Sequence, residues 1–221
     1  MPRTSNAPDA IDRFETSAEL ALALRQLCET EPRFASLFAA YGVPSLRRVA
    51  PTLESLLSIV TEQFLSLSAG AAIWARVKAR LGDVTSETVL TCSQDEMLAL
   101  GLSRAKAKCF HAAAGSAIDF PSCHLADARD FRVALLKIWG IGPWTADVFM
   151  LSVLGHADAW PAGDIALQHA MRDFLSLPER PGIKEMEALS LAWRPYRAAA
   201  ARLLWSHYRH LKGLAQAPSQ N

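Results

Sequence analysis

Cysteine is scarce in this sequence, and its four copies lie far apart. Cys28, Cys92, Cys109 and Cys123 form no C-x-x-C pair. Such scatter is typical of buried thiols rather than of disulfides, a zinc site or an iron–sulfur cluster. We therefore expect no metal centre built from side chains.

Long apolar runs are also missing. No stretch approaches the ~18 residues that cross a bilayer, and the opening MPRTSNAPDAIDRFETS lacks the apolar segment of a secretory signal. The sequence therefore predicts a cytoplasmic protein without a membrane partner. Charge is nearly balanced, with 23 Lys and Arg against 22 Asp and Glu, so net charge gives no sign of nucleic acid. A basic patch on one face remains compatible with that balance.

Strand patterns are nearly absent, because no alternating runs of β-branched and aromatic residues lie between turn residues. Helical periodicity occurs instead in about ten segments, as at Leu20, Leu24 and Leu27. Ser93 followed by Glu96 fits a capping box, and Gly82 fits a helix end. The segments are 17–30, 52–67, 71–82, 93–101, 103–119, 128–138, 143–155, 164–175, 183–193 and 195–211. We therefore predict an all-α fold.

The segment Leu135 to Ala170 carries the most informative pattern. A predicted helix is followed by Gly140-Ile141-Gly142, then by Pro143 at the first position of a second helix. Two glycines permit a very tight turn, because glycine accepts positive φ. The amides of Ile141, Gly142 and Trp144 would point outward and hold a phosphate. Taken alone, the pattern also fits a plain αα-turn.

A second feature follows this hairpin. The Gly/Pro-rich loop GHADAWPAGD leads to Asp164 at the start of the next helix, where the carboxylate is expected to cap the helix. Hairpin, helix, Gly/Pro loop and aspartate, in that order, resemble the helix-hairpin-helix (HhH-GPD) superfamily of base-excision DNA glycosylases. Asp164 would otherwise be a simple helix cap worth ~1 kcal/mol. The resemblance implies that it is the catalytic carboxylate.

Two missing features narrow the resemblance to one branch of this superfamily. Bifunctional members carry a lysine nucleophile where this chain has Trp144, and the iron–sulfur branch needs cysteines beyond Cys123. Both departures point to monofunctional enzymes that use water. The chain resembles the bacterial DNA-3-methyladenine glycosylase II family from about Leu20 to Tyr208.

That family implies two helical lobes with a DNA-binding cleft between them. One predicted lobe covers 52–156, with the hairpin at about 130–154. The second joins 17–51 to 157–213, and residues 1–16 and 214–221 are expected to be flexible. The partner is duplex DNA with a damaged base, bound by a monomer. No cofactor is required, although main-chain carbonyls around Ile138 and Gly140 could hold a monovalent cation.

Several side chains acquire roles through the resemblance. Trp144 and Trp205 match pocket tryptophans, which attract a cationic base by ~0.5–2 kcal/mol per contact. Phe64 falls at the position of the wedge that fills the gap left by a flipped base, with Gln63 beside it. Core packing is the alternative for the tryptophans, and a buried helical position is the alternative for Phe64. Nearby Arg104, Lys106 and Lys108 fit either phosphate contacts or a solvated face.

Where the family has further aromatics, this chain has Val148 and Ile165. We expect removal of alkylated purines of the 3-methyladenine and 7-methylguanine type, with Asp164 stabilising an oxocarbenium-like sugar, orienting water, or both. A glycosylase for another lesion, and a helix-hairpin-helix DNA-binding protein without activity, are the alternatives. A helical scaffold with no nucleic-acid role would show no salt-dependent affinity for duplex DNA.

Overall fold

The computed structural model describes residues 11–46 and 48–214. Within these ranges it contains α-helices, two short 3-10 helices and one isolated β-bridge, Arg13 to His156, but no strand. The all-α prediction is confirmed. The helices are α1 (Ser17–Thr30), α2 (Phe34–Tyr41), α3 (Leu53–Glu62), α4 (Leu67–Leu81), α5 (Ser86–Thr91), α6 (Gln94–Ala99), α7 (Arg104–Ala114), η1 (Cys123–Leu125), α8 (Ala128–Leu136), α9 (Pro143–Ser152), α10 (Ile165–Phe174), α11 (Ile183–Leu189), η2 (Leu191–Trp193) and α12 (Arg197–Leu211).

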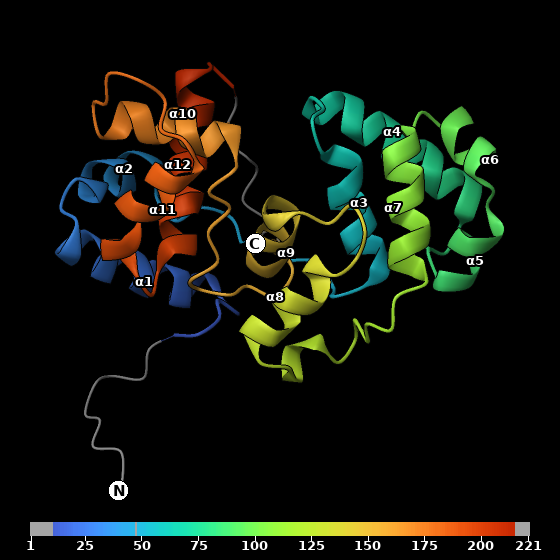
Figure 1. The fold of residues 1–221 in the computed structure, drawn as a ribbon. Helices are drawn as coiled ribbons and strands as arrows, with labels where there is room; N and C mark the ends of the chain where they lie inside the picture. The colour runs from blue at the N-terminus through green and yellow to red at the C-terminus, as the bar shows by residue number, and fades with distance from the viewer. Residues whose placement is uncertain (1–10, 47, 215–221) are drawn as a thin grey trace, which may run out of the picture. The chain divides into compact units, whose positions relative to one another are not determined.

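Contacts divide the described chain into two compact units. One runs over Arg48–Leu154 and holds α3 to α9. The other combines the residues before Arg48 with those from Gly155 onward, and so holds α1, α2 and α10 to α12 (Figure 1). The candidate aspartate and the hairpin therefore belong to different units.

The unit that joins the two chain ends is built around α12. This helix packs against α10, α2 and α1 (Figure 1), because its first half presents small side chains from Ala198 to Ala201 that are fully or almost fully buried. The predicted apolar face of α1, with Leu20, Leu24 and Leu27, is buried as expected. This packing fixes the position of α10, which begins directly after Asp164.

The central unit is built around α3, which contacts α4, α7 and α9. Its apolar residues Leu56, Leu57 and Val60 are fully buried. The expected capping box is present, since Ser93 accepts the Glu96 amide and Glu96 accepts the Ser93 amide. Gly82 ends α4 with φ +66.

Two predicted helices are interrupted. Segment 52–67 splits between α3 and α4, because Phe64 has φ +57 and Ser66 caps the new helix by accepting the Ala69 amide at 3.3 Å. Segment 183–193 breaks at Ser190, whose hydroxyl donates to the Glu187 carbonyl at 3.1 Å. The shorter helices α2 and α5 were not predicted, so the described helices outnumber the ten segments expected.

The segment before α1, part of the stretch expected to be flexible, contacts the loop that follows α9. Phe14 is fully buried, and its amide donates to the Gly155 carbonyl at 2.8 Å. The Ala157 amide likewise donates to the Asp12 carbonyl at 2.8 Å. Residues 1–10 and 215–221, the rest of the predicted flexible ends apart from Leu214, lie outside the described residues.

Candidate functional site

The predicted hairpin is formed by α8, α9 and the tight turn between them. The Ile141 amide donates to the Ile138 carbonyl at 3.1 Å, which closes a four-residue turn. Gly140 occupies the third position with φ +87, as a type II turn requires. Its Cα lies against α7, where a Cβ would come within 2.8 Å of the Cys109 Cβ. Gly140 is therefore needed both for its backbone conformation and for close packing.

The structure corrects two expectations about this turn. Gly142 has φ −93, a conformation open to any residue, and a Cβ there would meet no atom within 4 Å. The Ile141 amide does not point outward, because it is used within the turn, and the residue is buried. The sequence could not separate the two glycines, since the difference depends on what each one contacts.

The start of α9 nevertheless has the geometry of an anion site. Gly142 is the N-cap residue and Pro143 is the first helical residue, as predicted. First-turn amides of a helix lack acceptors within the helix, and the helix dipole places partial positive charge there. In α9 the first-turn residues that carry such amides are Trp144 and Thr145.

An ion pair that sequence reasoning missed joins the two hairpin helices. Arg132 of α8 donates from Nε to Asp147 Oδ1 at 2.5 Å and from Nη2 to Oδ2 at 2.9 Å. Asp147 is buried, so this two-point contact fixes α9 against α8. The available signal was a charged residue within the otherwise apolar run of α9.

The loop between α3 and α4 presents Phe64 to solvent. Its relative exposure is 103% and its φ is +57, which overturns the alternative of a buried helical residue. Beside it, the Gln63 side chain donates from Nε2 to the Thr145 hydroxyl of α9 at 2.5 Å. Gln63 thus links this loop to the hairpin.

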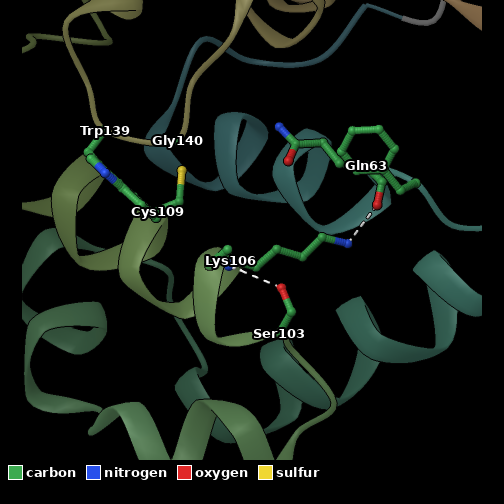
Figure 2. A pocket seen from close by; sticks show the side chains of 8 residues that line it. Gln63, Ser103, Lys106, Cys109, Trp139 and Gly140 are labelled. Carbon is green, nitrogen blue, oxygen red and sulfur yellow. Dashed lines mark hydrogen bonds between the residues drawn. The ribbon is translucent and has the colours of Figure 1, made fainter.

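A pocket of about 120 Å³ lies between the Phe64 loop, α7 and the hairpin turn (Figure 2). Its lining comprises Gln63, Phe64, Ser103, Ala105, Lys106, Cys109, Trp139 and Gly140. Burial raises the pKa of the Cys109 thiol to about 11, so this thiol stays protonated at neutral pH. The Lys108 ammonium lies 4.1 Å from the centre of the Trp139 ring. Lys108 is therefore stacked on the hairpin rather than simply solvated.

Asp164 takes the position predicted for it. It is the N-cap of α10, and its Oδ1 accepts the Leu167 amide at 2.9 Å. The same oxygen accepts the indole N–H of Trp205 from α12 at 3.1 Å. Asp164 and Trp205, both half-buried, are thus brought into direct contact, whereas Trp144, Gln63 and Phe64 belong to the other unit.

The Gly/Pro loop that leads to Asp164 is anchored at several points. Arg197, almost fully buried, donates to both carboxylate oxygens of Asp158, at 2.7 and 2.9 Å. Gln168 Nε2 donates to the Ala162 carbonyl at 3.0 Å, and the Asp164 amide donates to the Pro161 carbonyl at 2.8 Å. This loop therefore holds the carboxylate in a defined position. No sequence pattern pointed to Arg197.

The side chains that replace family aromatics lie in different settings. Ile165, directly after the aspartate, is 53% exposed, while Val148 of α9 is half-buried. Residues 11–46 and 48–214 contain no cluster of three or more His, Cys, Asp or Glu side chains able to hold a metal ion. Among the helices of these same ranges, none has the length and apolar character needed to cross a membrane.

Comparison with known proteins matches this arrangement to one family. The family model described as "HhH-GPD superfamily base excision DNA repair protein" matches residues 57–195. The chain is 27% identical over 170 residues to the alkylbase DNA glycosidase-like protein mag2 of Schizosaccharomyces pombe, covering 72% of this chain and 80% of that protein. It is 31% identical over 77 residues to a DNA-3-methyladenine glycosylase of Bacillus subtilis, covering 35% of this chain and only 25% of that protein.

A solved structure has the same fold. The 3-methyladenine DNA glycosylase Mag1 of Schizosaccharomyces pombe, in complex with abasic DNA, superposes with a TM-score of 0.75 at 24% identity. The match covers 90% of this chain and all of that chain.

Proposed function

The chain belongs to the HhH-GPD superfamily of base excision DNA repair proteins, and on that premise we propose that it is a monofunctional DNA glycosylase acting on alkylated purines in duplex DNA. The substrates would be of the 3-methyladenine and 7-methylguanine type. The observation that carries the proposal is Asp164, whose carboxylate is oriented by the Leu167 amide and the Trp205 indole at the N-terminus of α10.

In this proposal the carboxylate of Asp164 is the main group that the reaction requires from the protein. An N3- or N7-alkylated purine carries positive charge while attached to the sugar, so it leaves as a neutral base when the C1′–N bond breaks. The developing oxocarbenium-like sugar is stabilised by the negative charge of Asp164. A water oxygen then bonds to C1′, and its proton passes to the carboxylate.

Water is the nucleophile in this proposal because no lysine is present where bifunctional relatives carry one. The corresponding residue is Trp144 in the first turn of α9. An indole cannot form a Schiff base. The product would therefore be an abasic site with both strands intact.

Two features of the central unit support binding to damaged duplex. The N-terminus of α9 suits a backbone phosphate, and the exposed Phe64 ring is suited to fill the gap left by a flipped base. Neutral carbonyl oxygens around Ile138 and Gly140 suit a monovalent cation, although the Ile138 oxygen already accepts one hydrogen bond. That cation would help to hold a phosphate, and the bond-breaking step does not depend on it.

Asp164→Asn is the direct test. Asparagine is an equally good N-cap, so the fold should persist, while excision of 3-methyladenine and 7-methylguanine from methylated duplex should fall by at least ~100-fold. The matched control is Glu179→Gln, which neutralises an exposed carboxylate of the same unit and should leave excision unchanged. Undiminished excision by the Asp164 variant would remove this residue from the mechanism.

A panel of single-lesion duplexes separates the remaining alternatives. Because Val148 and Ile165 stand where relatives carry aromatics, a different lesion class is the second candidate. Release of oxidised or deaminated bases, but not of alkylated ones, would favour it. Salt-dependent binding with no base released across the panel would favour a DNA-binding protein without activity.

A further inference from the structure

Lys106 makes contacts that differ from those of a phosphate-binding lysine. Its Nζ donates to the main-chain carbonyls of Thr61 at 2.7 Å and Gln63 at 2.8 Å (Figure 2 shows the second). Burial lowers the pKa of this ammonium. No carboxylate among the residues described by the structure forms an ion pair with it. The charge of Lys106 is thus directed inward, at the loop that carries Phe64.

These two carbonyls belong to the end of α3. The last carbonyls of a helix lack intrahelical donors and carry partial negative charge, so an ammonium placed there stabilises the helix end. Lys106 comes from α7, 43 positions away from Gln63. It therefore fixes, from a neighbouring helix, the point at which α3 stops.

The residue directly after Gln63 is Phe64, which has an unfavourable backbone conformation. Left-handed φ costs an L-residue free energy, and a bulky side chain adopts it only when the surroundings require it. The Phe64 ring, fully exposed, has no packing that could supply this requirement. The hydrogen bond from Lys106 instead fixes the Gln63 carbonyl, and so the peptide plane that precedes Phe64.

A second contact fixes the same residue through its side chain. The Gln63 side chain donates to Thr145 in the first turns of α9. Main chain and side chain of Gln63 are thus held by α7 and by the hairpin helix. Two contacts from different helices therefore restrain the residue that precedes Phe64.

We propose that Lys106 is a positioning residue, which holds the Phe64 loop in the strained conformation that presents the aromatic ring to the DNA gap. It acts through Phe64 and not by binding a phosphate. This inference rests on the wedge role of Phe64 in the proposed function. Preorganisation of the loop would raise the affinity for duplex with a flipped or missing base, because only the fraction of the protein that holds the loop in the binding conformation binds.

The test compares Lys106→Met with Phe64→Ala and with the double variant, using full-length protein. The DNA is a duplex with a tetrahydrofuran abasic analogue, with 2-aminopurine beside it to report stacking in the gap. We expect Lys106→Met to weaken binding to this duplex about tenfold, in line with release of a left-handed residue, and to lower the 2-aminopurine response. Affinity for undamaged duplex and its salt dependence should change little.

Arg104→Met is the matched comparison, because it removes the positive charge of an exposed residue two positions before Lys106 on the same helix α7. If Arg104 meets a phosphate, this variant reduces the salt slope on both duplexes by about one unit. A Lys106→Met variant that behaves in this way, losing affinity equally for both duplexes, would overturn the inference in favour of a phosphate contact.

The double variant tests whether Lys106 acts through Phe64. If Lys106 acts through Phe64, its replacement adds little once Phe64 is alanine. Additive losses would overturn the inference while the wedge role stands. If Phe64→Ala binds the abasic duplex as tightly as wild type, the wedge role itself fails, and the inference with it. Should the methionine variant not fold, Lys106→Gln, which keeps an N–H donor on a slightly shorter side chain, is expected to give a loss on the abasic duplex only.

Discussion

Replacing Gly140 with alanine tests the geometry of the hairpin turn. With φ +87, this residue lies in the left-handed region, and an added Cβ would lie 2.8 Å from Cβ and 2.9 Å from Sγ of Cys109. Neither Cys109 atom can swing far, because Cβ is attached to the backbone of α7 and Sγ is buried. The alanine variant therefore suffers backbone strain and a steric clash together.

Each contribution has a typical size. A left-handed conformation costs an L-residue ~1–2 kcal/mol, and overpacking of a filled site costs ~1–3 kcal/mol. The smaller conformational freedom of alanine in the unfolded chain returns ~0.4–1 kcal/mol. We expect a net loss of about 1–4.5 kcal/mol, a large part of the ~5–15 kcal/mol that stabilises a domain.

Urea denaturation followed by far-UV circular dichroism measures this loss, and Gly142→Ala provides the matched control. Gly142 lies two positions later with φ −93, and a Cβ there meets no atom within 4 Å. We expect its alanine variant to change the free energy of unfolding by less than about 1 kcal/mol. Equal losses for the two variants, or a loss below about 0.5 kcal/mol for Gly140→Ala, would refute the assigned turn geometry.

Two further predictions concern Cys109 and Trp205. The folded pKa of Cys109, about 11, exceeds its ordinary value of 9.0. Below pH 9 the thiol is protonated in both the folded and the unfolded chain, and its full contribution to stability is present. As the pH rises from 9 toward 11, the unfolded thiol ionises before the buried one, so the free energy of unfolding falls. Between pH 8 and pH 11 this loss amounts to about 2 kcal/mol by linkage, so urea titrations at these two pH values should show a smaller drop for Cys109→Ala than for wild type. Trp205→Phe keeps an aromatic ring but removes the donor to Asp164, and should lower kcat for 7-methylguanine release about tenfold with a smaller change in KM. An unchanged kcat would show that this hydrogen bond does not orient the carboxylate.

Helix content and capping followed from the sequence because they depend on local chemistry. The spacing of Leu20, Leu24 and Leu27, and the Ser93–Glu96 box, act within one or two turns and need no distant partner. The interruption at Phe64 could not be predicted in this way. It depends on Lys106 and Thr145, which approach from other helices. A continuous apolar periodicity over 52–67 hid the break, although Ser66 gave a helix-cap signal.

In the candidate site, too, the features set by adjacent residues were predictable and those set by tertiary packing were not. Asp164 was found as a helix cap after a Gly/Pro loop, since both are patterns of adjacent residues. Its hydrogen bond from Trp205, 41 positions away, and the clamp of Arg197 on Asp158 depend on tertiary packing. The two hairpin glycines looked equivalent in sequence, and only the approach of α7 makes Gly140 different.

The surroundings of Asp164 bear on which bases this chain would remove. Ile165, exposed beside the aspartate, offers apolar contact but no electron-rich face for a cation. Trp205 has its N–H committed to the carboxylate, so its ring orientation is fixed rather than adaptable. Because Val148 and Ile165 stand where the family has aromatics, fewer aromatic contacts are available to the base than in that family. Less binding energy can then be directed at a poor leaving group. A cationic purine needs little such help, because its glycosidic bond is already weakened. If the chain acts as proposed, preference for charged over neutral lesions would follow from leaving-group chemistry, with Asp164 supplying the stabilisation that both classes need.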